Sequence, residues 1–418
     1  MTEQTSFWKK RLALFLASQA ITLFGSSLVQ YAILWKITLD TQSGFMMTLY
    51  LLFGFLPMFL LSPFAGVWAD RHDRKRLIML SDGMIALSTL ILAILFLSDY
   101  EAIWLLFAIP VIRALGSAIQ SPAVSAFLPQ FVPEGQLMKA NGLFSSIQST
   151  IMLLSPMVSG ALFTFASFEV ILLIDVVTAL LAILVLLALK TPAHVRKVVE
   201  PGQKYWHDMK AGLVYIRQHG YIKRFFIFSG IYFFLVTPAA LLTPLQVTRS
   251  FGEDIWRLTA IEVAFSTGML CGGLLIAAWG GFRNRVKTMV LATLVVGATT
   301  LLLGVVKDFW IYLAIVLLVG IAIPIFHTPS TVLLQEKVEA DYLGRVFSVM
   351  GMIASGMMPI AMFVFGPLAD VISIEWQLIA TGLLLLALGA GLYLNKVLLH
   401  AGEPLLKPEL PAESSFGD

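Results

Sequence analysis

Twelve long apolar runs constrain this sequence more than any other feature. A helix needs about 20 apolar residues to cross a bilayer, where its backbone groups must be satisfied within the protein. Charged residues make up only 13% of the 418 residues, about half their share in soluble domains. The predicted spans cover residues 12–35, 45–69, 77–97, 102–121, 140–165, 168–189, 222–247, 258–280, 288–306, 309–330, 345–368 and 376–396. The sequence therefore predicts an all-α polytopic membrane protein.

The basic residues are distributed unevenly between the two sides of these spans. If the N-terminus is inside, 23 of the 28 lysines and arginines fall in inner segments, four fall outside, and Arg113 falls within a span. Membrane proteins keep such an excess of positive charge in their cytoplasmic loops. We therefore expect both termini in the cytoplasm.

A short basic turn occurs twice, 211 positions apart. Residues 66–76 follow the second predicted span and residues 279–287 follow the eighth. The matched pairs are Trp68 with Trp279, Asp73 with Asn284, Arg74 with Arg285, and Arg76 with Lys287. Gln-Ser-Pro at 120–122, after the fourth span, has a counterpart in His-Thr-Pro at 327–329. Two parallel six-helix repeats are typical of carriers that work by alternating access.

The longest polar stretch separates six spans from the next six. The expected parts are an N-terminal half, a cytoplasmic linker, a C-terminal half and a cytoplasmic tail, over residues 1–189, 190–221, 222–397 and 398–418. Apolar residues in the linker recur at spacings of three and four, at Trp206, Met209, Leu213 and Ile216. This pattern predicts an amphipathic helix, either on the inner membrane surface or as a solvated linker helix.

The first basic turn leads to a family resemblance. Residues 66–75 read Gly-x-x-x-Asp-Arg-x-x-Arg-Lys, which resembles the signature between helices 2 and 3 of the major facilitator superfamily. Asp73 stands where most members have glycine. Four segments are similar to the macrolide-efflux branch of bacterial drug exporters, namely 70–75, 262–270, 335–337 and 342–348. The resemblance implies a twelve-helix major facilitator fold in the bacterial inner membrane and a drug exporter.

Two altered motifs extend this resemblance. Arg113 looks like the arginine of the superfamily's helix 4 signature, although Ser117 replaces the expected glycine. Ser155, Pro156 and Gly160 belong to a segment that resembles the Gly-Pro-x-x-Gly-Gly motif of proton-coupled exporters, with two of its glycines replaced by serine. The resemblance implies exchange of the substrate for protons.

Four ionisable residues inside predicted spans need an explanation, and they are Asp82, Arg113, Asp175 and Glu262. Each costs about 2.5–3.5 kcal/mol on insertion scales. A carboxyl group inside a bilayer can bind and release a proton, because burial disfavours its charged form. Asp175, seven residues into the sixth span, and Glu262, four residues into the eighth, are our candidates for proton coupling. Structural hydrogen bonding by Asp175 and an ordinary interfacial position for Glu262 are the alternatives.

Charged residues at the inner end of the N-terminal half predict a gate. We expect Asp82 and Arg113 to form a charge network there with Asp70. Asp70 could also face the N-terminus of the eleventh helix, where the helix dipole favours a negative charge. Breaking and remaking that contact would gate the inner side. Arg71 and Arg74 would fix orientation under this interpretation, and also if the basic turn has a purely topological role.

Polar side chains on two helices are candidates for the substrate path, which is expected between the halves near the bilayer midplane. The first span carries a polar stripe on one face, made by Gln19, Thr22, Ser26 and Gln30. This stripe either lines the cavity or makes hydrogen bonds between helices. The seventh span adds Tyr232, Phe233 and Thr237 beside Pro238, which permits a kink.

Transport of a small molecule accounts best for these features. The leading hypothesis is proton-driven export of a hydrophobic or amphipathic, macrolide-like drug, neutral or cationic, by a monomer that rocks its two halves within the bilayer. Export of a siderophore or lysolipid, or uptake, is the alternative among transporters, and a non-transporting receptor is the alternative outside them. Nucleotide, zinc and nucleophile motifs are absent and Cys271 is the only cysteine, so we expect no enzyme activity, cofactor, metal or nucleic-acid partner.

Overall fold

The computed structural model describes residues 2–189 and 214–403, a part of the chain that is almost entirely helical and contains no strand. The first six long helices are α1 (Thr2–Thr41), α2 (Gly44–Arg71), α3 (Arg74–Leu97), α4 (Leu105–Phe127), α5 (Leu137–Phe165) and α6 (Phe168–Ala188). The helices after the linker, of which α9 and α15 are short, are α8 (Gly220–Leu241), α9 (Thr243–Ser250), α10 (Ile255–Trp279), α11 (Arg285–Leu303), α12 (Phe309–Lys337), α13 (Ala340–Leu368), α14 (Ile374–Leu394) and α15 (Lys396–Ala401).

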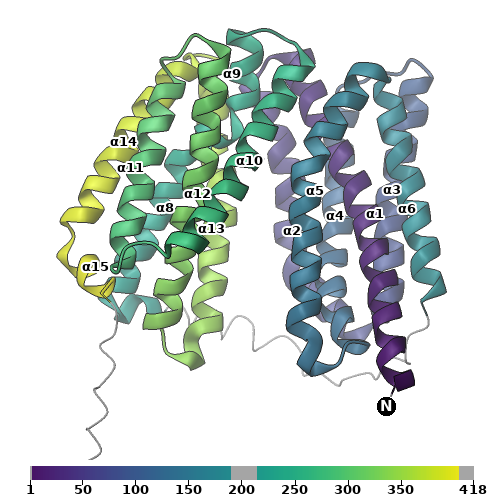
Figure 1. The fold of residues 1–418 in the computed structure, drawn as a ribbon. Coiled ribbons are helices and arrows are strands. Elements are labelled where there is room, and N and C mark those ends of the chain that lie inside the picture. Colours follow the sequence, from purple (N-terminus) through teal and green to yellow (C-terminus); the bar gives the residue numbers. More distant parts are fainter. Residues whose placement is uncertain (1, 190–213, 404–418) are drawn as a thin grey trace, which may run out of the picture.

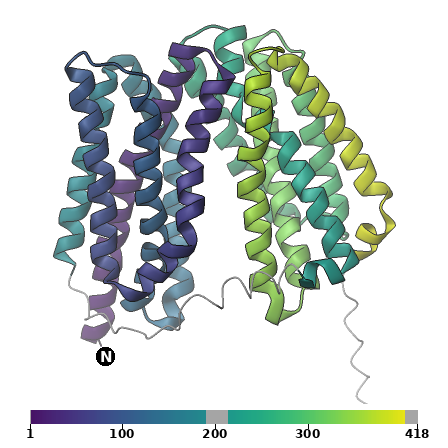
Figure 2. The ribbon, with the colours of Figure 1, turned by 180° about the vertical axis from the view of Figure 1, so that it is seen from behind.

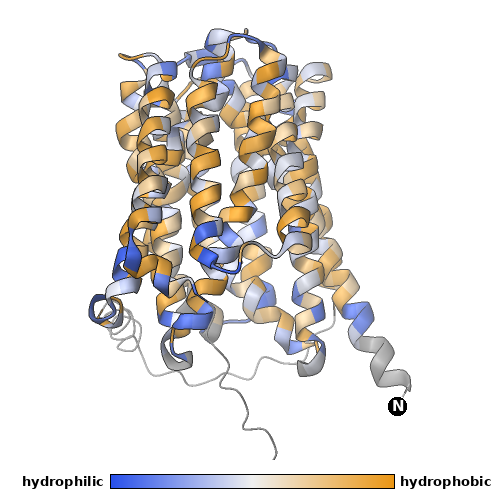
Figure 3. Ribbon diagram, turned by 60° about the vertical axis from the view of Figure 1, so that its left-hand side comes forward, coloured by the Kyte–Doolittle hydropathy of each residue, from blue (hydrophilic) through white to orange (hydrophobic). Residues whose placement is uncertain are grey.

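Twelve segments of this structure are long and apolar enough to cross a membrane, which confirms the predicted number. Figure 3 shows hydrophobic residues along the middle of the helices and hydrophilic residues mostly toward the two ends. The helix ends differ from the predicted spans. The seventh span consists of α8 and α9, which meet at Leu242, and α4 continues to Phe127. Residues 120–122 therefore lie inside α4 and not after it, because neighbouring helices allow proline within a membrane helix.

The helices form two bundles, one from α1–α6 and one from α8–α14 (Figure 1). The N-terminus and α15 lie at the same end of the molecule. We name this the inner end, after the predicted orientation, and the opposite end the outer end. Of the predicted linker helix, Ile216 is buried against the second bundle, whereas Trp206, Met209 and Leu213 lie outside the described residues.

The two basic turns make matching contacts, which confirms the internal repeat. Asp73 caps α3 by accepting from the Arg76 amide, and Asn284 caps α11 by accepting from the amides of the next turn. Arg74 donates to the carbonyls of residues 69 and 126, at the ends of α2 and α4, at 3.0 and 2.7 Å. Arg285 likewise donates to the carbonyl of residue 280 and pairs with Glu336 at the end of α12. Arg71 is exposed.

The two bundles meet at their outer ends (Figure 2). Thr48 of α2 donates to the Met362 carbonyl of α13 at 3.0 Å. Gly366 allows this close approach, because a Cβ atom there would lie 1.7 Å from the Thr48 hydroxyl oxygen. The two bundles diverge toward the inner end (Figure 2), where Met138 at the start of α5 is 89% exposed. The structure is therefore closed at the outer end and open at the inner end.

Candidate transport site

A buried ion pair joins four helices of the first bundle. Arg113 of α4 contacts Asp175 of α6, with 2.6 Å between Nη1 and Oδ2, and the Asp175 side chain is 1% exposed. Thr89 of α3 donates to the same carboxylate oxygen at 3.0 Å. Ser26 of α1 donates to the other oxygen at 3.4 Å and accepts from Arg113 through its carbonyl at 3.1 Å. Good geometry and added hydrogen bonds are what allow a buried ion pair to offset its desolvation.

The other buried carboxylate of this bundle, Asp82, has different partners. Its Oδ1 accepts from the Thr22 hydroxyl at 2.9 Å and from the Gln120 amide at 2.5 Å. Its Oδ2 has no partner among the described residues. We expected Arg113 to form a network with Asp70 and Asp82, but it pairs with Asp175. The reason is that Arg113 is the ninth residue of α4 and lies nearer the outer end than the predicted span implied. The Asp70 side chain is outside the described part of the structure.

The four residues of the polar stripe of α1 have different partners and surroundings in the structure. Thr22 and Ser26 use their hydroxyls to bond Asp82 and Asp175, which is the helix-to-helix bonding given above as the alternative. Gln19 is buried, and its amide nitrogen has no partner among the described residues. Gln30 is exposed and lines a cavity of about 340 Å³ that also borders Arg113. Of the four stripe residues, Ser26 and Gln30 therefore line this cavity.

The α5 motif lies where the bundles meet. Ser155 and Pro156 are buried, and Gly160 packs against Thr259 of α10, so that a Cβ atom at Gly160 would lie 1.7 Å from the Thr259 hydroxyl oxygen. On α8, Thr237 is buried and donates to the carbonyl of residue 233 in its own helix. That hydroxyl is satisfied within the helix, so Thr237 is a less suitable substrate contact than the sequence suggested.

An apolar cavity of about 310 Å³ lies mainly in the second bundle. Tyr232 and Phe233 of α8 line it together with Glu262 of α10 and His327 of α12, and Met152 reaches it from the first bundle. Most of the remaining wall is aliphatic or aromatic. A cavity with an apolar wall and few polar groups is typical of a site for small organic molecules.

Glu262 lies deeper than the sequence suggested. Helix α10 begins at Ile255, three residues before the predicted span, so Glu262 is its eighth residue and lies two turns into the helix. The side chain is partly buried, and its carboxyl group lies near the Tyr31 hydroxyl of α1. Glu262 therefore lies beside a residue of the other bundle. An ordinary interfacial position does not describe such a residue.

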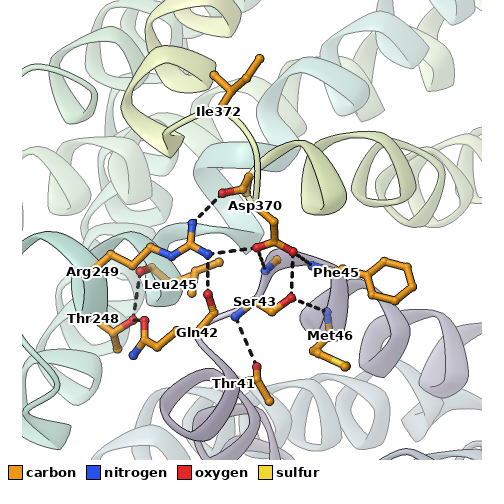
Figure 4. A network of polar contacts seen from close by, with 12 residues as sticks. Thr41, Gln42, Ser43, Phe45, Met46, Leu245, Thr248, Arg249, Asp370 and Ile372 are labelled. Carbon is orange, nitrogen blue, oxygen red and sulfur yellow. Dashed lines mark hydrogen bonds and ion pairs between the residues drawn. The ribbon is translucent and has the colours of Figure 1, made fainter.

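Sequence reasoning missed a polar cluster that ties the outer ends together. We name its residues the outer lock, and they are Gln42, Ser43, Thr248, Arg249 and Asp370 (Figure 4). Arg249 pairs with Asp370 at 3.0 Å, donates to the carbonyl of residue 369 at 2.6 Å, and donates to the Gln42 carbonyl of the first bundle. Thr248 donates to the Gln42 side chain at 3.0 Å. The cluster joins the α1–α2 loop to α9 and to the end of α13.

Asp370 also caps the first turn of α2. Its carboxylate accepts from the Ser43 hydroxyl at 2.8 Å and from the amides of Gly44 and Phe45 at 2.7 and 3.0 Å. Partial burial raises the pKa of Asp370, but the hydrogen bonds from Phe45, Ser43, Gly44 and Arg249 outweigh it and hold this pKa below its usual range. The sequence offered a weak signal, since Arg249 and Asp370 are opposite charges in outer segments, but it did not reveal their pairing.

Comparisons with known proteins bear on this arrangement. The family model described as Major Facilitator Superfamily matches residues 13–362. Macrolide efflux protein A of Streptococcus pyogenes is 30% identical over 388 residues, which cover 92% of this chain and 96% of that protein. Macrolide efflux protein A of Enterococcus faecalis is 31% identical over 313 residues, 74% of this chain and 97% of that protein. The crystal structure of a bacterial homologue of the human lysosomal transporter Spinster, in an inward-facing and unoccupied conformation, matches with a TM-score of 0.66 and 14% identity, over 95% of this chain and 98% of that one.

Proposed function

The chain belongs to the major facilitator superfamily, and we propose that this multi-pass membrane transporter exports macrolide-like drugs from the bacterial cytoplasm in exchange for protons. The similarity to macrolide efflux protein A over most of both chains supports drug export. The observation that carries the proposal is the apolar cavity with Glu262 on its wall. Such a site suits a hydrophobic or amphipathic molecule better than a small hydrophilic one.

The open inner end fits a carrier that is ready to accept a cytoplasmic substrate. With both termini in the cytoplasm, as the basic residues predict, the end at which the two bundles diverge faces the cell interior. The outer lock and the contact between Thr48 and Met362 close the opposite side. Rocking of the two bundles about the site would close the inner end and open the outer end.

Proton coupling rests on two carboxyl groups with different surroundings. Asp175 is the counter-ion of Arg113, so a proton on Asp175 would weaken that pair and release α4 from α6. Glu262 lines the cavity and lies near Tyr31. A proton on Glu262 would remove the charge that faces the substrate. The two groups together would link proton entry to substrate release.

The outer lock supports a gating role for Asp70, because α2 and α13 lie side by side and could make a similar contact at either end. At the outer end, Asp370 follows α13 and caps the N-terminus of α2. At the inner end, Asp70 lies near the end of α2 and would cap the N-terminus of α13 when the inner side closes. The same interaction would then alternate between the two ends, with the helices exchanging roles. Arg74 holds the ends of α2 and α4 in place for this exchange.

Accumulation of a labelled macrolide tests the proposal in cells that lack their own exporters. Cells with the protein should accumulate less drug than cells with an empty vector, and a protonophore should abolish the difference. Unchanged accumulation would contradict macrolide export, and a substrate screen that includes siderophores and lysolipids would follow. Raised accumulation would indicate uptake. Drug binding without any change in accumulation would indicate a receptor.

A further inference from the structure

Asp82 of α3 is a buried carboxyl group with one satisfied and one unsatisfied oxygen. Its side chain is 1% exposed. The Thr22 hydroxyl and the Gln120 amide both donate to Oδ1, at 2.9 and 2.5 Å, and Oδ2 is buried without a partner among the described residues. An ionised carboxylate carries charge on both oxygens, and a buried charge without a partner is costly. A proton on Oδ2 leaves an unpaired hydroxyl, which costs less, and Oδ1 keeps both hydrogen bonds.

The charged groups nearest in depth to Asp82 do not compensate its charge. In the middle of the helices packed against α3, the described charged side chains are Arg113 of α4 and Asp175 of α6. These two pair with each other, with 2.6 Å between Nη1 and Oδ2. If both acids were ionised, the buried part of this bundle would carry one negative charge in excess. A proton on Asp82 cancels that excess.

The other described charged groups of the surrounding helices lie toward the helix ends. At the outer end, Lys36 of α1 pairs with Asp40 at 3.2 Å. At the inner end, Arg74 and Lys75 of α3 donate to main-chain carbonyls. Among the described residues, Asp82 therefore has no cation as a partner, and a proton is the simplest way to neutralise it.

Both hydrogen-bond partners of Asp82 extend the polar wall of a cavity. Ser26 of α1 and Ser117 of α4 line the cavity of about 340 Å³ in the first bundle. Thr22 lies four residues before Ser26, and Gln120 lies three residues after Ser117, so each lies about one helical turn farther toward the inner end. The two helix faces that border the cavity therefore lead to Asp82.

Helix α1 links Asp82 to the ion pair of the same bundle. Thr22 donates to Asp82, and Ser26, one turn away, donates to Asp175 at 3.4 Å. Two acids this close, with one arginine between them, do not ionise independently. Asp175 has Arg113 and hydroxyl donors on its two oxygens, which suits the ionised form. Asp82 has donors on one oxygen, which suits the protonated form.

We propose that Asp82 is a third proton site, which holds the proton of the first bundle while the inner end is open and Asp175 stays ionised in its pair with Arg113. The inference rests on the proposed function and deepens it, because it names the group that gives the proton to the cytoplasm. The proton leaves Oδ2 of Asp82 for water at the inner end. The excess negative charge that remains favours uptake of the next proton once the outer end has opened.

Infrared difference spectroscopy on the purified full-length protein in lipid nanodiscs tests this inference without any substrate. The carbonyl stretch of a protonated carboxylic acid is separate from the bands of an ionised carboxylate, and it shifts in heavy water. The unchanged protein should show this band at neutral pH, and Asp82→Asn should lose it. Asp82→Glu should keep a band at a shifted frequency, which decides the question if the asparagine variant does not fold. Glu262→Gln and the exposed-site variant Asp99→Asn should keep the Asp82 band.

Thermal stability separates a protonated Asp82 from an ionised one. Asparagine resembles the protonated acid, so Asp82→Asn should leave the melting temperature at neutral pH nearly unchanged. Asp175→Asn removes a carboxyl group from the same bundle and should lower the melting temperature by several degrees, because it leaves Arg113 without its buried partner. Spectra in sodium chloride and in choline chloride at one pH should be identical, because the site takes a proton and not a metal cation.

Four results would overturn the inference. They are the absence of the band in the unchanged protein, a band at full strength in Asp82→Asn, a band that sodium ions remove at constant pH, and equal destabilisation by Asp82→Asn and Asp175→Asn. An Asp82 band with no export of macrolide from cells would uphold this inference and contradict the proposed function. Proton-driven macrolide export by a protein whose band does not depend on Asp82 would do the reverse.

Discussion

Asp370→Asn should open the outer end of the transporter. The substitution keeps the shape of the side chain but removes its negative charge and one acceptor oxygen. The carboxylate now serves four donors, which are the Ser43 hydroxyl, the amides of Gly44 and Phe45, and the Arg249 guanidinium. An asparagine cannot serve all four, and it no longer complements the positive N-terminus of α2.

The size of the effect follows from the exposure of the lock. The side chains of Arg249 and Asp370 are 31% and 29% exposed, so solvent limits their ion pair to about 0–1 kcal/mol. Loss of the negative charge at a helix N-terminus removes about 0.3–1 kcal/mol, and one lost hydrogen bond removes about 1 kcal/mol. The closed outer end should therefore lose about 1–3 kcal/mol, which shifts the equilibrium toward outer opening by about 5–150-fold.

Spin labels at Tyr100 and Lys307, exposed outer positions of the two bundles, measure this shift. Opening of the outer end should increase the population of long distances between the two labels. Asp99→Asn is the matched control, because Asp99 is exposed in an outer loop and asparagine tolerates its positive φ of 59°. A distance distribution equal to that of the unchanged protein, in a folded Asp370→Asn variant, would refute the reasoning. The pH dependence gives a second check. Because the pKa of Asp370 is lowered, its contribution is complete at neutral pH and is lost only as the pH falls through that lowered pKa.

The other predictions concern the membrane-embedded residues. Asp175→Asn or Glu262→Gln should abolish the effect of a protonophore on macrolide accumulation while the protein stays in the membrane; full proton-driven export in both variants would remove the coupling hypothesis. Arg113→Gln should lower the melting temperature, because it leaves Asp175 buried without a counter-ion at a cost of about 3–5 kcal/mol. Adding Asp175→Asn to the same chain should restore much of the lost stability. An Arg113→Gln variant as stable as the unchanged protein would argue against this pairing. Asp70→Asn should slow turnover more than it weakens drug binding, and equal transport rates would rule out gating. Gln30→Leu should alter the relative resistance to different drugs, whereas an identical profile would assign Gln30 to packing.

The sequence alone predicted the twelve spans and their repetition, because the bilayer imposes a length on each apolar run. It also marked the basic turns, where a few residues close in sequence make the bonds. Asp73 and Asn284 cap the helix that directly follows them. Arg74 and Arg285 reach back five residues to a carbonyl. Contacts over so few residues depend little on how distant helices pack.

Tertiary structure decided which distant polar groups became partners. Arg113 and Asp175 lie 62 positions apart, and their pairing depends on the rotation and depth of α4 and α6. Helix α10 begins three residues earlier than the predicted span, so Glu262 lies near Tyr31 and not at the membrane boundary. The pairing of Arg249 with Asp370 required α9 and the segment after α13 to meet at the outer end. In a bilayer almost every face of a helix is apolar, so hydropathy fixes where a helix runs, and only side-chain packing fixes which face meets which neighbour.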